Sequence, residues 1–163
     1  MPPVLSIVGK SESGKTTLIE NLIPELKKRG YRIGVVKHAH HGFEIDRKGK
    51  DSYRHKQAGA DSVMIVSPGT IAMIKRVSTQ RLEDLIPFFG DVDLLITEGF
   101  KRDPAPKIEV FRAERHRSPA CLEDASLIAL VSDTPLNTAV PRFAPGDIEA
   151  ITHFIVTRFL PKH

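Results

Sequence analysis

The spacing of apolar and polar positions changes along the first forty residues in a way that predicts successive elements. The apolar run Val4–Val8 ends at a glycine and is typical of a strand buried in a parallel sheet. Residues 15–29 then carry apolar side chains at helical spacing and stop at Gly30. Pro24 lies inside this segment and predicts a kink or a local break in the helix. Because residues 32–37 form a second strand-like run, the chain opens as a right-handed strand–helix–strand crossover.

Polar residues dominate the next segment, 38–60, and long polar stretches inside a compact domain are typically functional or mobile. Beyond it the pattern predicts alternating elements over the rest of the chain. We expect a short helix at 51–58, a hairpin of strands 61–66 and 70–74 around Ser67-Pro68-Gly69, a helix at 81–89, strands at 93–97, 107–112 and 127–131, and a last helix that Asp147 caps and that runs to about residue 159. The alternation predicts one α/β domain over residues 1–163, a mainly parallel sheet flanked by helices with an added antiparallel hairpin.

Composition narrows the class of protein. The chain has 163 residues, of which 40% are hydrophobic and 27% charged, as in ordinary soluble domains. No apolar run approaches the roughly 20 residues that cross a membrane, and the N-terminus lacks the features of a signal peptide. Cys121 is the single cysteine, which excludes an internal disulfide and a cysteine-rich metal site. We therefore expect a cytoplasmic protein with no membrane association.

The net charge of +4 favours anionic partners. Six of the cationic side chains fall within 17 residues, and they form either a solvated basic face or a surface for such a partner. The segment lacks the interleaved aromatic residues that stack on bases, so we expect no nucleic-acid partner. The six residues are Lys101, Arg102, Lys107, Arg112, Arg115 and Arg117.

The loop after the first strand matches the phosphate-loop pattern G-x-x-x-x-G-K-[ST] through Gly9, Gly14, Lys15 and Thr16. The two glycines let the backbone approach phosphate closely, and successive N–H groups then point inward at the start of a helix. Lys15 is expected to reach the β- and γ-phosphates and to act in catalysis, and Thr16 to bind Mg²⁺. The predicted nucleotide-binding set is Gly9, Lys10, Ser11, Glu12, Ser13, Gly14, Lys15, Thr16 and Thr17, the last beside the α-phosphate.

A phosphate loop needs an acidic group at the carboxyl end of a neighbouring strand. Glu98 follows the apolar run 94–97 at that end, whereas Asp93 precedes the run. Glu98 is therefore expected to contact Mg²⁺ directly or through water, or to orient the attacking water. Asp46, in the polar segment, is a second predicted magnesium ligand, and Asp51 is a weaker alternative because it could cap the following helix.

A histidine cluster, His38, His40 and His41, ends the second predicted strand, and His55 lies downstream. Zinc binding is one reading of these imidazoles, but the spacing is not typical of structural zinc. Contact with an anionic ligand, together with the neighbouring lysines and arginines, is the favoured reading. The third interpretation is a mobile, solvated polar loop.

Taken together, these motifs resemble the molybdopterin-guanine dinucleotide biosynthesis protein B (MobB) family. The resemblance covers about residues 4–112, and the histidine and Asp-Ser-x-Arg-His blocks are more specific than the phosphate loop. The matching blocks are the phosphate loop, residues 36–43, Asp46 with Gly49-Lys50-Asp51-Ser52, residues 54–60, and Thr97-Glu98-Gly99-Phe100-Lys101.

The resemblance implies a fold of the phosphate-loop NTPase class and a homodimeric protein that binds GTP and Mg²⁺ with weak GTPase activity. It also implies a role as an accessory to the molybdenum cofactor guanylyltransferase, which joins GMP to molybdopterin. Molybdopterin is a further expected ligand, suited to the basic histidine–lysine segment. Lys10 stands where one branch of phosphate-loop proteins carries a lysine that reaches a partner's nucleotide, although an exposed lysine at the loop rim is equally open.

The chain has no Asn-Lys-x-Asp motif, which would recognise guanine. The nearest substitute is Asp133, directly after the 127–131 strand, where a carboxylate could accept from guanine N1–H and N2–H. A turn-starting aspartate before Thr134-Pro135 is the alternative.

Two other functions use the same loop. A small-molecule kinase would close residues 38–56 as a lid, and a non-catalytic adapter would use nucleotide to order that segment. No arginine finger is evident, although Arg102 is a conceivable one in cis. The outer edge of the hairpin around residues 67–75 is expected to pair with a second copy in a homodimer.

Overall fold

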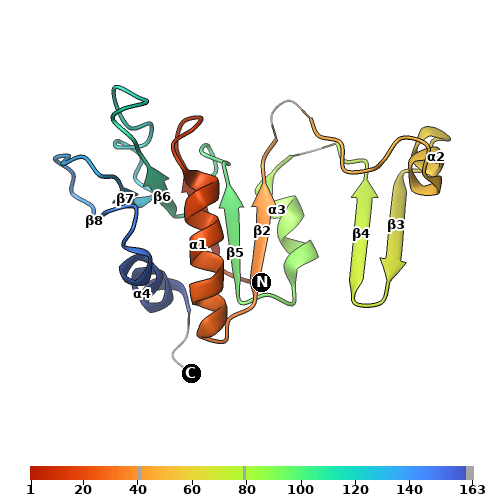
Figure 1. The fold of residues 1–163 in the computed structure, drawn as a ribbon, viewed down its shortest axis with the longest axis horizontal. Coiled ribbons are helices and arrows are strands. Elements are labelled where there is room, and N and C mark those ends of the chain that lie inside the picture. The colour runs from red at the N-terminus through yellow and green to blue at the C-terminus, as the bar shows by residue number, and fades with distance from the viewer. Residues whose placement is uncertain (40–41, 79, 161–163) are drawn as a thin grey trace. The chain divides into compact units, whose positions relative to one another are not determined.

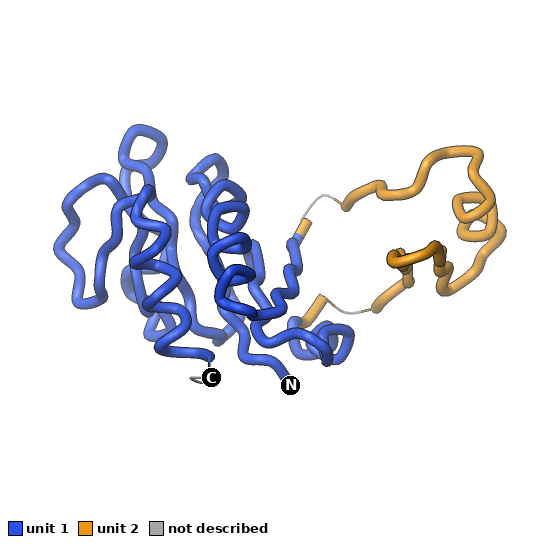
Figure 2. Tube along the Cα trace, turned by 60° about the horizontal axis from the view of Figure 1, so that its bottom comes forward, with its two compact units in different colours: residues 1–38, 82–163 blue, residues 39–81 orange. Residues whose placement is uncertain are grey.

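The computed structural model describes residues 1–39, 42–78 and 80–160 (Figure 1). The chain forms two compact units, residues 1–38 with 82–163, and residues 39–81, which Figure 2 colours blue and orange. The first unit contains the phosphate loop and the large sheet, and the second contains the hairpin. That residues 1–163 act as a single nucleotide-binding domain stays a prediction.

The first unit is built on a six-stranded sheet in the order β2-β5-β1-β6-β7-β8. Every pairing along this order is parallel, and β5 separates the two strands of the opening crossover. The central strands are buried, which explains their near-continuous apolar runs. The strands are β1 Val4–Val8, β2 Ile33–Lys37, β5 Leu94–Glu98, β6 Lys107–Val110, β7 Leu127–Val131 and β8 Arg142–Phe143.

Helices α1 (Lys15–Lys28) and α4 (Ile148–Phe159) pack against each other and, with the sheet, enclose the main core. Leu22 and Leu26 of α1 and Ile151 and Ile155 of α4 are fully buried there. The segment predicted as one helix over 81–89 is a short α-helix, α3 (Leu82–Leu85), followed by a 3₁₀ turn, η1 (Ile86–Phe89). The α/β prediction is confirmed.

Three local details differ from the sequence-based expectations or add to them. The break expected at Pro24 is absent, because α1 continues through it. Because proline has no N–H, the carbonyl of Glu20 loses its helical hydrogen bond, but Glu20 is exposed. The buried leucines on either side, Leu22 and Leu26, stabilise the helix. Asp147 is the N-cap residue of α4, as predicted, but its carboxylate accepts from Ala144 N at 3.1 Å and makes no side-chain bond to the helix. The two-residue strand β8 was not predicted, because it is too short to carry a pattern.

The second unit contains α2 (Asp51–Gln57) and an antiparallel hairpin of β3 (Ser62–Ser67) and β4 (Thr70–Lys75). Both elements were predicted, and α2 contacts β3. Asp51 is the first residue of α2, and Lys50 occupies the cap position. In the described parts of the chain, no helix has the length and apolar content needed to cross a membrane.

Candidate phosphate site

The phosphate loop leaves β1 at Val8 and enters α1 at Lys15, with a backbone that only glycine adopts readily at its two ends. Gly9 has φ +143° and Gly14 has φ +98°. A Cβ on Gly9 would lie 2.4 Å from Val110 O and 2.7 Å from Ser13 Oγ, so the loop and the end of β6 pack backbone to backbone. Between them Glu12 takes the left-handed conformation at φ 59°. The loop therefore curls tightly over the start of α1, as an anion nest requires.

Two lysines brace this curl. Lys15 Nζ donates to Lys10 O at 2.7 Å, and Lys10 Nζ donates to Ser118 O at 2.8 Å in the same chain. Burial lowers the pKa of Lys15 from its ordinary value, and Lys37 adds to this, while the charge of Glu98 opposes it. The contact of Lys10 with a partner's nucleotide stays a prediction.

Glu98 ends β5 beside the phosphate loop. Its Oε1 accepts from Thr16 Oγ1 at 2.9 Å and lies 3.4 Å from Lys37 Nζ. The sheet register places Glu98 level with Ile7 of β1 and Lys37 of β2, so three carboxyl strand ends meet here. The structure thus brings together the two side chains predicted for magnesium at this edge, Thr16 and Glu98.

Backbone curvature continues past Glu98. Gly99 has φ +101° and donates to Ile7 O at 3.0 Å, and Phe100 has φ 53°. The ring of His38 stacks on Phe100 with centroids 4.8 Å apart, and His38 N donates to Glu98 O. His38 is therefore held beside Glu98 by a ring contact and a backbone bond.

A loop after β6, residues 111–121, closes over the phosphate loop, and sequence reasoning missed it. Besides the Ser118 carbonyl bonded to Lys10, it brings His116 Nε2 to 2.7 Å from Ser11 O and Arg115 to 3.7 Å from Glu12. The Arg112 guanidinium would lie 3.2 Å from a Cβ on Gly14. Arg102, the arginine suggested from sequence, lies exposed in the turn after β5. Arg112 and Arg115 are therefore the arginines that approach the phosphate loop, and Arg112 lies against its second glycine.

Two buried charges anchor this second loop. The carboxylate of Glu109 on β6 is 1% exposed and accepts from Ala120 N and Cys121 N. Lys107, also 1% exposed, pairs with Asp124 at 3.1 Å and donates to Ser126 Oγ. Hydrogen bonds from Ser126, with the charge of Lys107, hold the pKa of Asp124 down at about 2. Each buried charge has partners, as burial requires.

Ser13, within the phosphate loop, is fully buried, and its Oγ has no hydrogen-bond partner among the described residues. Ser11, Glu12, Thr16 and Thr17 are exposed. The loop thus presents polar groups to solvent around a buried, unpaired hydroxyl, which is the arrangement that an anionic ligand would complete.

The remaining predicted residues lie elsewhere. Asp133 is exposed after β7, and its Oδ1 accepts from Thr134 Oγ1 at 3.1 Å. Asp46 belongs to the second unit, where its Oδ1 accepts from Ser52 Oγ and Arg47 N, so its place at a magnesium ion stays a prediction. His40 and His41 fall outside the described residues. Within the described ranges, no group of three or more His, Cys, Asp or Glu side chains is arranged to hold a metal.

Comparison with known proteins adds the family. The family model described as "Molybdopterin guanine dinucleotide synthesis protein B", MobB, matches residues 4–133. The chain belongs to the MobB family. The match extends past residue 112, where the resemblance in the sequence ends, and covers the loop after β6 and strand β7.

Relatives agree with this assignment over most of the chain. The molybdopterin-guanine dinucleotide biosynthesis adapter protein of Escherichia coli is 37% identical over 96% of this chain and 93% of its own. The adapter protein of Haemophilus influenzae is 39% identical over 82% of this chain and 76% of its own. Among solved structures, Bacillus subtilis MobB aligns with TM-score 0.80 and 27% identity over 98% of this chain and 99% of its own. The MobB fold therefore covers both units.

Proposed function

We propose that this chain is a magnesium-dependent GTP-binding adapter of molybdenum cofactor biosynthesis. It assists a guanylyltransferase that attaches GMP to molybdopterin, forming molybdopterin-guanine dinucleotide. Family membership supports the pathway, since the relatives carry the adapter name. The single observation that carries nucleotide binding is the curled loop between Gly9 and Thr16, with Glu98 hydrogen-bonded to Thr16.

The residues present fit a magnesium nucleotide. Thr16 and Glu98 offer oxygen ligands 2.9 Å apart, and Mg²⁺ prefers a few such ligands alongside phosphate oxygens and water. Bound there, the ion would neutralise phosphate charge. With a nucleotide bound, Lys15 would be free to exchange its bond to the Lys10 carbonyl for the β- and γ-phosphates, and Ser13 Oγ would have a partner. Glu98 would hold the ion directly or through a water.

Turnover is proposed to be slow. Arg112 stands near Gly14, at the base of the loop, with its guanidinium 3.7 Å from Glu114. From this position Arg112 is proposed to support phosphate binding. Glu98 is the only acidic side chain proposed to orient the attacking water, which is consistent with slow hydrolysis. Asp133 selects guanine by accepting from N1–H and N2–H. The proposed role is that of a cytoplasmic adapter with weak GTPase activity.

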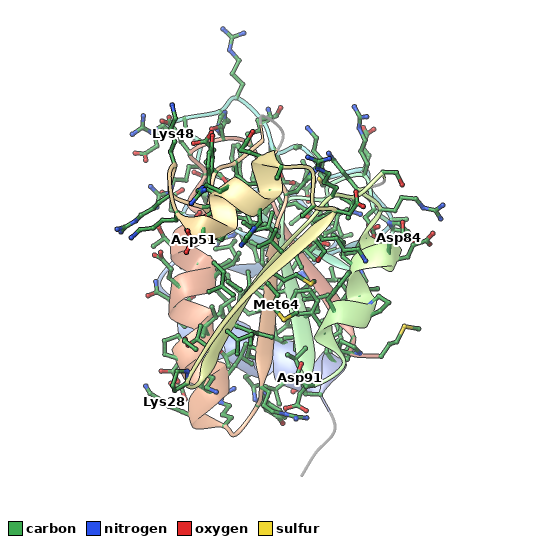
Figure 3. All side chains as sticks on the ribbon, turned by 90° about the vertical axis from the view of Figure 1, so that its right-hand side faces the viewer. Lys28, Lys48, Asp51, Met64, Asp84 and Asp91 are labelled. Atoms are coloured by element: carbon green, nitrogen blue, oxygen red, sulfur yellow. The ribbon has the colours of Figure 1, made fainter. Side chains whose placement is uncertain are left out.

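A homodimer is proposed through the hairpin. The register pairs Met64 with Met73 and Val66 with Ile71, so these four apolar side chains share one face, and they are 41–68% exposed (Met64 is labelled in Figure 3). Exposed apolar faces on isolated hairpins are typical protein contacts. Light scattering should give twice 18.1 kDa. Ile71→Glu should yield monomers, and Thr70→Glu, on the opposite face, should not.

The experiment that tests nucleotide binding is isothermal calorimetry with GTP, GDP and ATP, each with and without Mg²⁺. Lys15→Ala should abolish binding, whereas Lys27→Ala, an exposed lysine on the same helix, should leave it unchanged. Equal affinity of the two variants would reject the phosphate site. A second assay uses GTP labelled at the γ-phosphate and identifies the labelled product. Free labelled phosphate supports a GTPase, whereas label transferred to an organic acceptor would support a kinase.

A further inference from the structure

The second unit contains a cavity of its own, about 580 Å³ in volume, between the segment 45–52, helix α2 and strand β3. Its lining includes an unusual mixture of one constrained carboxylate, three basic side chains and an apolar wall. The volume falls in the range of small-molecule sites, roughly 300–1,000 Å³. Phosphate-site residues do not contribute to it, so it needs an explanation separate from the GTP site.

Asp46 supplies the constrained carboxylate. Its Oδ1 accepts from Ser52 Oγ and from Arg47 N, both at 2.9 Å, which fixes the orientation of the group. Its Oδ2 is buried and has no hydrogen-bond partner among the described residues. A buried carboxylate oxygen without a donor is unfavourable, so this atom calls for an N–H group from a ligand.

Arg47, Lys50 and His55 bring the basic side chains to the same cavity. In the described parts of the chain, neither Arg47 nor Lys50 forms an ion pair through its side chain. Asp51, which also lines the cavity, is paired with Arg54 at 3.7 Å (Asp51 and the neighbouring Lys48 are labelled in Figure 3). Unpaired arginine and lysine beside a pocket that is open to solvent are suited to a phosphate group.

The apolar wall comes from Ile45 and from strand β3, which contributes Val63 and Ile65 from one face and Met64 and Val66 from the other. Ile45 is 72% exposed and Ile65 47%. Such side chains offer a surface on which a flat ring can lie, since covering them removes apolar area from water.

From these three features we infer that the cavity binds a phosphorylated heterocycle whose edge carries adjacent N–H donors. The 2-amino-4-oxopyrimidine edge, which pterins and guanine share, presents a ring N–H and an amino N–H side by side, and either of them supplies the donor that Asp46 Oδ2 lacks. The phosphate lies against Arg47 and Lys50, and the ring on Ile45 and Ile65. The inference deepens the proposed function, because it gives the adapter a site for a pterin phosphate or for the guanine nucleotide joined to it.

This role of Asp46 differs from the magnesium role predicted from the sequence, and the two have different consequences. If Asp46 serves the cavity, Asp46→Asn weakens binding of the heterocycle and leaves the affinity for GTP with Mg²⁺ unchanged. If Asp46 binds magnesium, the same substitution weakens GTP binding and spares the heterocycle, which would overturn the inference.

The test is a fluorescence titration of the full chain with neopterin monophosphate, whose ring is its own reporter. Competition with neopterin, GMP, AMP and inorganic phosphate distinguishes recognition of the ring edge from recognition of the phosphate group. We expect neopterin monophosphate or GMP to bind at least about tenfold more tightly than AMP or phosphate. Measurement in a Lys15→Ala background removes the phosphate loop, and the affinity for the heterocycle should not change. AMP or phosphate binding as tightly as both guanine-edge ligands would overturn the inference.

Variants then assign the contacts. Asp46→Asn should weaken binding about 10- to 100-fold, as expected for loss of a charged acceptor. The double variant Arg47→Ala, Lys50→Ala should bind neopterin monophosphate no more tightly than neopterin. The control Lys48→Ala, at a residue outside the lining, should leave the affinity unchanged. If Asp46→Asn does not fold, the double variant Arg47→Ala, Lys50→Ala still tests the site. Unchanged affinity of that variant for neopterin monophosphate would refute the inference. GTP binding measured in parallel separates failure of this site from failure of the proposed function.

Discussion

Substituting Gly9 tests the packing of the phosphate loop most sharply, because two separate penalties act at this position. The backbone angle φ +143° is nearly restricted to glycine, and holding another residue there costs about 1–3 kcal/mol. In addition, a Cβ would stand 2.4 Å from Val110 O, whereas an ordinary C···O contact is about 3.3 Å, so the loop and β6 would have to separate. Such overpacking costs about 1–3 kcal/mol.

Gly9→Ala should therefore lower the free energy of unfolding by about 4 kcal/mol, or the melting temperature by about 8–16 °C. The matched control is Gly30→Ala: Gly30 also has a positive φ, +88°, but a Cβ there would meet nothing within 4 Å. That variant has only the backbone penalty, about 1–2 kcal/mol. Since the loop is displaced only in Gly9→Ala, only that variant should lose the stabilisation that GTP with Mg²⁺ confers.

Urea denaturation and melting with and without nucleotide measure both quantities. If Gly9→Ala is as stable as Gly30→Ala and keeps the same stabilisation by GTP, the close backbone contact does not shape the site, and the reasoning fails.

Three further outcomes follow from the second loop. Arg112→Ala should weaken binding of GTP about tenfold with little change in melting temperature, and calorimetry that finds equal affinity would exclude Arg112 from the site. Glu109→Gln keeps one acceptor oxygen and replaces the other with an NH2 group, so one of the Ala120 and Cys121 amides loses its partner. Hydrogen exchange of residues 112–120 should then rise, and exchange as slow as in wild type would contradict the anchoring role. Asp124→Asn should cost about 2 kcal/mol, less than for a fully buried pair because Asp124 is 33% exposed. Because the folded-state pKa of Asp124 is lowered to about 2, its contribution is present above pH about 4 and lost as pH falls through 2; a variant with the wild-type acid profile would refute this.

Much of the site follows from local sequence. The phosphate loop is one continuous segment whose strand and helix flank it, so the pattern around Gly9 and Lys15 predicts its own surroundings. Glu98 follows from a general rule about the carboxyl ends of parallel strands, and the structure places it 2.9 Å from Thr16. The hairpin and α2 were likewise predictable from turn residues and spacing.

The second loop was not predictable in this way. Lys10 and Ser118 are 108 residues apart, and only the adjacency of β1 and β6 in the sheet brings them together. Lys107 and Glu109 give β6 the appearance of a half-exposed strand, yet both are buried, because partners from the 103–126 region satisfy their charges. The division at residues 39 and 81 also escapes a reading of local pattern.

The central claim is that the loop from Gly9 to Thr16 binds a guanine nucleotide with Mg²⁺ through Lys15 and Glu98. The most direct measurement is calorimetric binding of GTP to wild type, Lys15→Ala and Glu98→Gln, with Mg²⁺ or with a chelator. The account predicts tight binding to wild type only with Mg²⁺, no binding to Lys15→Ala, and binding to Glu98→Gln that has lost its dependence on Mg²⁺. Equal, magnesium-independent binding to all three proteins would contradict it.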